Sequence, residues 1–201
     1  MLISSYNNKG LKDVLIIQLK NCNIENQLTE RKGNITKIYE KKSGKVIGYN
    51  LFNASDVLDL SENGPVTLTE EQVELLNELL KENNWEDTLT VDNSPKFVVG
   101  YVKECEPLAD SDHLNVTKIE IDKEEIVQIV CGAGNIQAGQ KVVVAKRGAI
   151  MPDGLVIWPG ELRGVKSNGM VCSAKELGLQ QTSKGILVLD ESEETGRPFT
   201  V

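Results

Sequence analysis

Residues 97–201 consist of short β-type runs separated by glycines, and this alternation restricts the fold more than any other feature of the chain. Valine and isoleucine are concentrated in these runs, which is typical of strands, and the glycines supply turns between them. A small helix is expected at 173–177, where Ser173 and Glu176 have the spacing of a capping box and Gly178 ends the pattern. Many short strands with glycine turns and one small helix predict a closed or nearly closed β-barrel. The expected strands are 97–105, 115–121, 126–131, 141–145 and 185–189, with a further hairpin near 150–158.

Residues 1–92 mix both kinds of element and predict a small α+β domain. The clearest helix is expected at 69–81, because Thr69 and Gln72 also have capping-box spacing and an apolar stripe follows them. We interpret that stripe as core. No arrangement of chemically active residues occurs in this domain, so the sequence leaves its role unknown. The other expected elements are strands at 14–19, 35–39 and 46–52, a tight turn at Ser43-Gly44 and a short helix at 53–60.

A boundary between two domains is expected at 93–96. Ser94-Pro95 disfavours a continuing helix, because the residue before a proline avoids helical backbone angles. A β-type run begins directly afterwards at Phe97. The predicted fold class is therefore α+β and β-rich, with an α+β domain at 1–92, a linker at 93–96 and a barrel domain at 97–201.

The composition argues against several classes of protein. No run of about 18 apolar residues occurs, and residues 1–10 lack the pattern of a signal peptide, so a cytoplasmic location is expected. The 4 cysteines have no CxxC spacing, and His113 is the single histidine. We therefore expect reduced thiols, no metal site and no cofactor.

The net charge of −8 is unusual for a protein that binds nucleic acid, but the charge is unevenly distributed. Residues 141–176 carry six basic and three acidic side chains, a local positive excess. At cellular salt, exposed charges farther apart than roughly 8–10 Å are largely screened from each other. A local positive patch can therefore act on an acidic protein, and the overall acidity should suppress indiscriminate binding to RNA.

Two segments resemble enzyme motifs but have the wrong spacing. Residues 164–169 read GVKSNG, one residue longer than the nucleophile elbow of serine hydrolases, and His113 precedes Ser167 instead of following it. Residues 131–139 read CGAGNIQAG, which lacks the third glycine of a dinucleotide-binding fingerprint, and no helical pattern follows. We interpret this second segment as a glycine turn between barrel strands.

A third candidate, ADSDHL, places Asp110, Asp112 and His113 in one short turn. A carboxylate pair beside a histidine can serve acid–base or metal chemistry, but a second cluster of ligands is missing. We interpret this segment as a solvated turn. No enzymatic activity is therefore expected.

Residues 161–178, ELRGVKSNGMVCSAKELG, suit a surface that holds a folded polyanion. Arg163 and Lys166 are suited to phosphates, arginine through its planar fork and lysine as a point charge. Ser167 can hydrogen-bond a phosphate, a 2′-hydroxyl or a base edge, and Met170 can pack on an unstacked base. Each of these residues alone is more often a solvated, turn or core residue, so it is their joint spacing that indicates RNA binding.

The stretch RGVKSNGMVCSAKELGL closely resembles the signature of the tRNA-binding domain family. The family domain has an OB-fold and occurs at the N-terminal end of the bacterial phenylalanyl-tRNA synthetase beta chain. Segments ERKGNI, GYNLFNAS and NSPKFVVGYV extend the resemblance to YtpR-type tRNA-binding proteins, which carry an α+β domain in front. Further support comes from FVVGYV at 97–102, ADSDHLNV at 109–116, QIVCGAGNI at 128–136, KVVVAKRGAIMP at 141–152 and GILVL at 185–189.

The resemblance implies non-catalytic binding of structured RNA, above all tRNA, by shape and backbone contacts on an OB-fold barrel at 97–201. Family members that bind tRNA have the serine and methionine of the RG-x-x-S-x-GM segment at the RNA-contacting surface, and these match Ser167 and Met170. Chemistry and position add four residues to the expected site: Asn135, Lys146, Arg163 and Lys166.

An alternative function is a protein-interaction adaptor associated with a tRNA synthetase or the translation machinery. In that case the N-terminal domain would supply the specific protein partner. Some free-standing relatives dimerise through their barrels, so a homodimer is also an open expectation.

Overall fold

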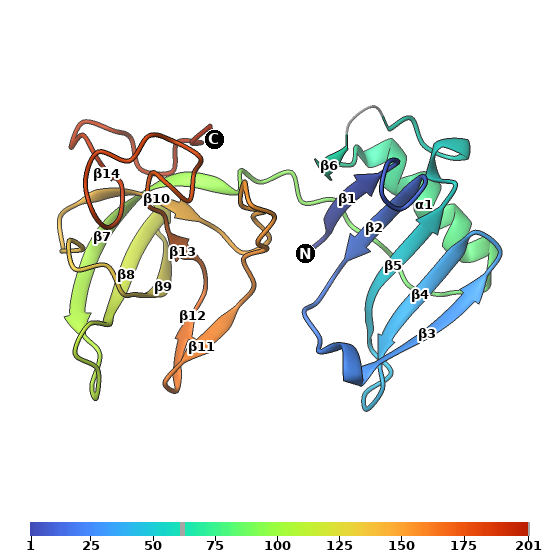
Figure 1. Cartoon of the computed structure of the whole chain (residues 1–201), viewed down its shortest axis with the longest axis horizontal. Helices are drawn as coiled ribbons and strands as arrows, with labels where there is room; N and C mark the ends of the chain where they lie inside the picture. Colours follow the sequence, from blue (N-terminus) through green and yellow to red (C-terminus); the bar gives the residue numbers. More distant parts are fainter. Residues whose placement is uncertain (61–62, 201) are drawn as a thin grey trace. The chain divides into compact units, whose positions relative to one another are not determined.

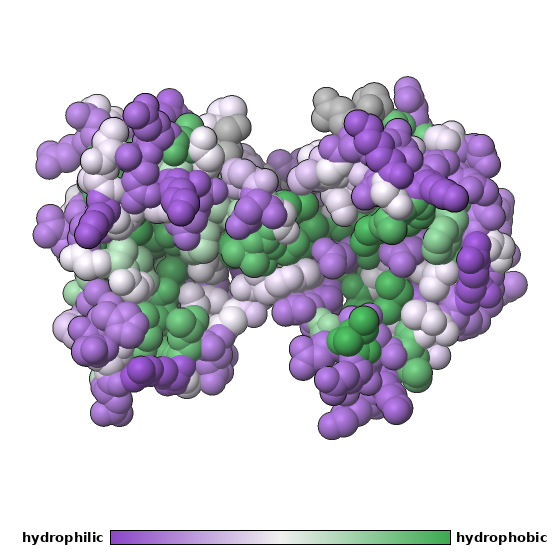
Figure 2. All heavy atoms as spheres, viewed as in Figure 1, coloured by the Kyte–Doolittle hydropathy of each residue, from purple (hydrophilic) through white to green (hydrophobic). Residues whose placement is uncertain are grey.

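The structure is a computed structural model that describes residues 1–60 and 63–200. The chain divides into two compact units, Met1–Asn93 and Ser94–Val201 (Figure 1). Both units are rich in strands, and the described residues contain one α-helix. In that described part, no helix has the length and apolar character needed to cross a membrane. Hydrophilic side chains cover most of the visible surface of each unit, with apolar side chains in smaller areas between them (Figure 2).

The N-terminal unit is built on an antiparallel sheet with the strand order β3-β4-β5-β2-β1-β6. The strands expected at 14–19, 35–39 and 46–52 are confirmed as β2, β4 and β5, and Gly44 takes a positive φ of 68° in the turn that joins the last two. β3 was not predicted, because its sequence QLTERK is almost entirely polar, yet its backbone pairs with β4 along the whole strand. The strands are β1 Ile3–Asn7, β2 Val14–Gln18, β3 Gln27–Lys32, β4 Ile35–Glu40, β5 Val46–Phe52 and β6 Gly64–Val66.

The helix α1, Glu70–Glu82, confirms the helix expected at 69–81. The Thr69 side chain accepts a hydrogen bond from the Gln72 backbone at 3.2 Å, and the Gln72 side chain accepts one from the Thr69 backbone at 3.0 Å. This reciprocal pair satisfies amide groups that the first helical turn leaves free. The short helix expected at 53–60 is reduced to a 3-10 turn, Ala54–Asp56, and another such turn occupies Ile24–Asn26.

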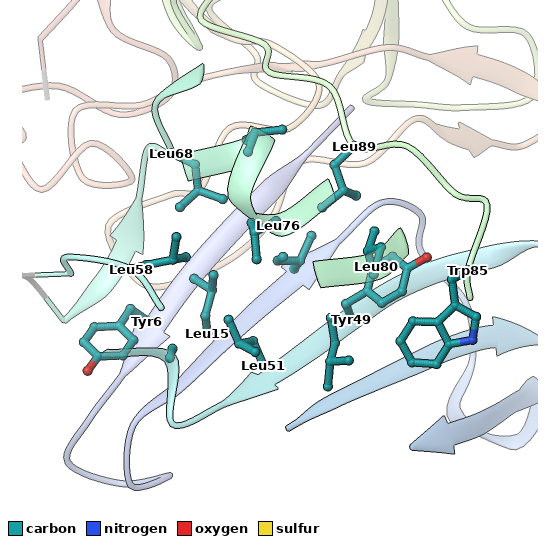
Figure 3. Close-up of a cluster of buried hydrophobic side chains, with 14 residues drawn as sticks. Tyr6, Leu15, Tyr49, Leu51, Leu58, Leu68, Leu76, Leu80, Trp85 and Leu89 are labelled. Atoms are coloured by element: carbon teal, nitrogen blue, oxygen red, sulfur yellow. The ribbon is translucent and has the colours of Figure 1, made fainter. Parts of the chain in front are cut away.

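One apolar face of the sheet packs against α1 and forms the core of this unit (Figure 3). Tyr49 and Trp85 pack against each other there, with ring centroids 6.0 Å apart. The Lys32 and Lys37 ammonium groups lie 4.8 and 5.9 Å from the centroid of the Trp85 ring. The core also contains Tyr6, Leu15, Leu51, Leu58, Leu68, Leu76, Leu80 and Leu89.

The C-terminal unit has a sheet with the strand order β13-β10-β7-β8-β9, with β14 also paired to β10. The central strand β10 is buried on both faces. Val142 and Val144 point into one apolar cluster, whereas Val143 and Ala145 point into another. A separate hairpin joins β11 to β12. The strands are β7 Phe97–Pro107, β8 Asn115–Asp122, β9 Glu125–Cys131, β10 Lys141–Ala145, β11 Gly160–Leu162, β12 Val165–Ser167, β13 Met170–Val171 and β14 Val188–Leu189.

Two expectations for this unit need correction, the helix at 173–177 and the strand at 185–189. The helix expected at 173–177 is a single hydrogen-bonded turn, in which the Leu177 amide donates to the Ser173 carbonyl at 3.3 Å. Five residues are too few for a helix to propagate after its costly first turn. The strand expected at 185–189 is reduced to β14. The hairpin expected near 150–158 is present: a bridge joins Ile150 to Val156, and the amides of Ile157 and Met151 donate to the carbonyls of Ala149 and Leu155 at 2.9 and 2.8 Å. The hairpin β11–β12 was not predicted, because its short strands carry charged residues and little apolar alternation.

Candidate nucleic-acid interface

The hairpin β11–β12 presents Arg163 at its tip. Arg163 and Gly164 form the two-residue turn, with positive φ values of 48° and 80°. Positive φ at both central positions is the geometry that matches the twist of a hairpin, and glycine adopts it without strain. Glu161 and Lys166 face each other directly across the two strands. The turn therefore projects an arginine, and the second residue pair from the turn contains a lysine.

The side chain of Arg163 links the hairpin to the turn between β7 and β8. Its guanidinium group donates a hydrogen bond to the carbonyl oxygen of Asp110, whose own φ is 61°. The turn is closed by the Leu108 amide, which donates to the Leu114 carbonyl at 2.8 Å. Because guanidinium carries five donors, most of the Arg163 fork stays available to a phosphate.

Ser167, which was expected at the RNA-contacting surface, is largely buried, and its contact with RNA stays a prediction. Only 6% of its surface is exposed, and its hydroxyl oxygen accepts a hydrogen bond from the backbone amide of Val130 at 3.1 Å. The hydroxyl can still donate a hydrogen bond, because its contact as a donor is long, 3.5 Å to the Gly169 carbonyl, but its burial limits access for RNA. The structure instead gives Ser167 the role of fastening β12 to β9.

Neighbouring residues complete this junction between β12 and β9. The Gln128 side chain donates to the Lys166 carbonyl at 2.8 Å, and the Asn168 amide donates to the Gln128 carbonyl at 2.8 Å. Gly169 has a φ of 153°, and a Cβ atom there would lie 2.9 Å from the Ala145 carbonyl oxygen. The serine and the second glycine of the sequence signature are therefore explained by packing of the junction, and both depend on contacts with distant parts of the chain.

Met170 is half-buried at the edge of a surface hollow. It pairs with Ala145 of β10 and packs against the apolar cluster that contains Val143 and Ala145. The remainder of its side chain lines a hollow of about 380 Å³. The lining residues are Val130, Cys131, Gly132, Ala133, Met170, Val171, Ser173, Glu176, Gln181, Gly185 and Ile186.

Asn135 is partly exposed and has a structural role, and its expected contact with RNA stays a prediction. Its side-chain nitrogen donates to the Ile186 carbonyl at 3.1 Å, and its side-chain oxygen accepts from the Ile186 amide at 3.0 Å. Gly185 passes so close that a Cβ atom there would lie 2.0 Å from the Asn135 side-chain oxygen. Asn135 therefore fixes the 185–186 segment, which forms one wall of the hollow.

The unpaired cations of this unit are concentrated in one part of the chain. On β7 and β8, Lys103 and Lys118 form ion pairs with glutamates at 3.2 and 2.6 Å. Apart from Lys123 in the β8–β9 turn, the cations without an ion pair or side-chain hydrogen bond to the described residues all lie between positions 146 and 184. They are Lys146, Arg147, Lys166, Lys175 and Lys184. Local charge counting pointed to the first four of these, but Lys184 lies outside the segment that was counted.

The remaining candidate groups do not form a chemical site. His113 and Asp112 pair at 2.6 Å with side chains 61% and 93% exposed, and the hydrogen bond from His113 lowers the pKa of Asp112. Burial raises the pKa of the Cys172 thiol to about 12, which leaves it protonated and unreactive. Within residues 1–60 and 63–200, no group of three or more histidine, cysteine, aspartate or glutamate side chains is arranged to hold a metal ion.

Comparison with known proteins assigns each unit separately. Residues 97–198 match the family model described as "Putative tRNA binding domain", and residues 23–92 match one described as "Domain of unknown function (DUF4479)". The chain is 50% identical over 196 residues to "Putative tRNA-binding protein YtpR" of Bacillus subtilis, covering 96% of this chain and 97% of that protein. It is 52% identical over 107 residues to the phenylalanine–tRNA ligase beta subunit of Campylobacter jejuni, covering 52% of this chain and 14% of that subunit.

The crystal structure of the C-terminal domain of Plasmodium vivax p43 is similar to part of this chain, with 25% sequence identity and a TM-score of 0.36. The match covers 50% of this chain and 56% of the p43 chain. That score is too low to add to the argument. The family match to half the chain and the near full-length similarity to YtpR carry the assignment. The chain therefore belongs to the tRNA-binding domain family.

Proposed function

We propose that this protein binds tRNA, or RNA of similar structure, without catalysing a reaction on it. The single observation that carries this proposal is the concentration of unpaired cations on the C-terminal unit between positions 146 and 184. Cations without a protein partner can neutralise phosphates at little cost, because no existing ion pair has to be broken. The named function of the YtpR relative agrees with this use of the unit.

The scaffold for this surface is an OB-fold barrel at 97–201, joined to the domain at 1–92 through the linker 93–96. β13 pairs with β10, and β12 is bonded to β9 through Ser167 and Gln128. These contacts lie between strands at or near the two ends of the sheet order β13-β10-β7-β8-β9, and they support the proposal that the sheet closes into a barrel. In such a barrel the hairpin β11–β12 and the β7–β8 turn, which the Arg163 side chain links, would share one rim and could meet the outside of a folded RNA.

The proposed contacts are phosphate contacts from Arg163, Lys166 and Lys146 and a base contact from Met170. Three or four neutralised phosphates would make the logarithm of the affinity fall with the logarithm of salt at a slope of roughly −2 to −4. Such contacts follow the shape of the backbone and do not read base sequence. We expect this binding to take place in the cytoplasm.

The N-terminal unit is proposed to contact a protein and not the RNA. A hollow of about 690 Å³ lies between α1 and residues 84–88. Four carboxylates and one lysine line it, so its charge disfavours phosphates: Glu74, Glu78, Lys81, Glu86 and Asp87. This observation favours an additional adaptor role toward a synthetase or another translation component. Self-association through the barrel stays a further proposal.

Equilibrium binding of bulk tRNA and of unfolded RNA of equal length, each between about 50 and 200 mM salt, tests the main proposal. We expect tighter binding of tRNA and the slope given above. Lys166→Ala should reduce the steepness of the slope by about one, since it removes one phosphate contact. The matched control is Lys103→Ala, because Lys103 is already paired with Glu120. An affinity for tRNA that does not change with salt concentration, or equal affinities for tRNA and unfolded RNA, would contradict the proposal.

A further inference from the structure

The hollow beside Met170 is larger than a site for one phosphate group needs to be, and its lining includes apolar residues that a phosphate does not require. Its volume of about 380 Å³ lies at the lower end of the range, roughly 300–1,000 Å³, in which proteins enclose small organic groups. We propose that this hollow receives the base of one unpaired nucleotide of the bound RNA. The inference rests on the proposed function, because the base must belong to an RNA that the unit already holds.

The walls of the hollow suit the faces of a planar base. Met170 is half-buried and presents a polarisable thioether that adapts its shape, whereas Val130, Val171 and Ile186 line the hollow with only the small exposed part of their side chains. Sequence-specific recognition of RNA commonly uses unpaired bases that leave the stack, pack on side chains and are hydrogen-bonded at their edges. The conformation of the far wall is fixed, because Asn135 holds Ile186 by two hydrogen bonds.

The polar end of the hollow carries acceptors that have no hydrogen-bond partner among the described residues. One carboxylate oxygen of Glu176, Oε2, accepts from both the amide and the hydroxyl of Ser173 at 2.7 Å, which leaves Oε1 free. The Gln181 side-chain nitrogen donates to the Ser183 carbonyl at 2.7 Å, which leaves its oxygen free. Free acceptors complement the N–H groups of a base, and the exocyclic amine of cytosine, adenine or guanine supplies donors that uracil lacks.

The charges around the hollow determine which part of the nucleotide enters. The Glu176 carboxylate in the lining repels a phosphate, whereas Lys175 and Lys184 directly adjoin lining residues in the chain and are unpaired. The base therefore enters the hollow and the flanking phosphates stay at its edge. This arrangement differs from the backbone contacts of the hairpin, because it senses whether an unpaired nucleotide is present.

Filling the hollow tests this inference. Gln181 is exposed and lines the hollow, so Gln181→Trp should place a ring where the base would lie. The matched control is Leu179→Trp, because Leu179 is 43% exposed and lies outside the lining. We expect Gln181→Trp to weaken tRNA binding about tenfold, the usual effect of losing one stacked base, with an unchanged salt slope. We expect Leu179→Trp to bind as the wild type does.

Equal tRNA affinity of Gln181→Trp and Leu179→Trp, in variants with wild-type circular dichroism, would overturn the inference while the proposed function stands. Absence of tRNA binding by the wild type would instead refute the proposed function itself. A second measurement uses short oligocytidine and oligouridine as competitors of bound tRNA. The wild type should prefer oligocytidine, and Gln181→Trp should abolish that preference; equal competition by both oligonucleotides in the wild type would contradict the role of the free acceptors.

Discussion

Replacing Ser167 by alanine separates a structural role from a direct RNA contact. The substitution removes the acceptor of the Val130 amide, which is itself buried, since Val130 is only 9% exposed. A buried amide without a partner costs about 1–3 kcal/mol. In a domain of this size, each kcal/mol lowers the midpoint of thermal unfolding by roughly 4–8 °C. We therefore expect a clearly measurable loss of stability in the C-terminal unit.

Thermal unfolding followed by the fluorescence of Trp158, with amide hydrogen exchange at Val130, measures this loss. Trp158 is the only tryptophan of the C-terminal unit, whereas Trp85 reports the N-terminal unit. The Val130 amide should exchange faster in Ser167→Ala. The control is Ser192→Ala, because the Ser192 hydroxyl also makes one bond, to Asp190 at 2.6 Å, but on the surface. The control should stay within about 0.5 kcal/mol of the wild type.

The binding result completes the experiment. If Ser167 fastens β12 to β9, tRNA affinity should fall together with protection of the hairpin against exchange. Wild-type stability combined with a specific loss of tRNA affinity would refute this reasoning, because it would show that the hydroxyl contacts RNA directly.

Two further predictions concern burial and charge elsewhere in the chain. In the native protein a thiol reagent should modify Cys22 first, because burial raises the pKa of Cys105, Cys131 and Cys172. After denaturation all 4 cysteines should react. Modification of Cys172 in the native protein at the rate of Cys22 would contradict the burial of Cys172. Asp87→Asn should destabilise the N-terminal unit by about 0.5–1 kcal/mol at neutral pH, because the pair with Lys37 at 2.5 Å is partly exposed. Burial raises the pKa of Asp87, but the hydrogen bond and charge of Lys37 together with the nearby Tyr49 hydroxyl outweigh burial and hold the pKa below the ordinary 3.8. The wild-type advantage should therefore be full above pH 3.8 and vanish as the pH falls further, and an advantage that persists in strong acid would refute this account.

Much of the fold could be predicted because it depends on contiguous residues. The strand 46–52 and the helix α1 follow from an apolar run and from a capping box, both of which act within a few positions of the chain. β3 could not be predicted in the same way. Its polar residues form a strand only because β4 offers a free backbone edge, and that information lies in the partner and not in the segment.

The candidate site also combines features that contiguous residues determine with features that depend on the tertiary structure. The sequence by itself determined the family and the local excess of positive charge, whereas the turn that projects Arg163 came from the structure. Only the tertiary structure decided that Ser167 and Asn135 face inward, because their hydrogen-bond partners lie 37 and 51 residues away in the chain. It also decided that Met170, Glu176 and Gln181 share one hollow. A side chain's chemistry is fixed by its type, but whether it meets solvent or a distant backbone group is fixed by the packing of the whole unit.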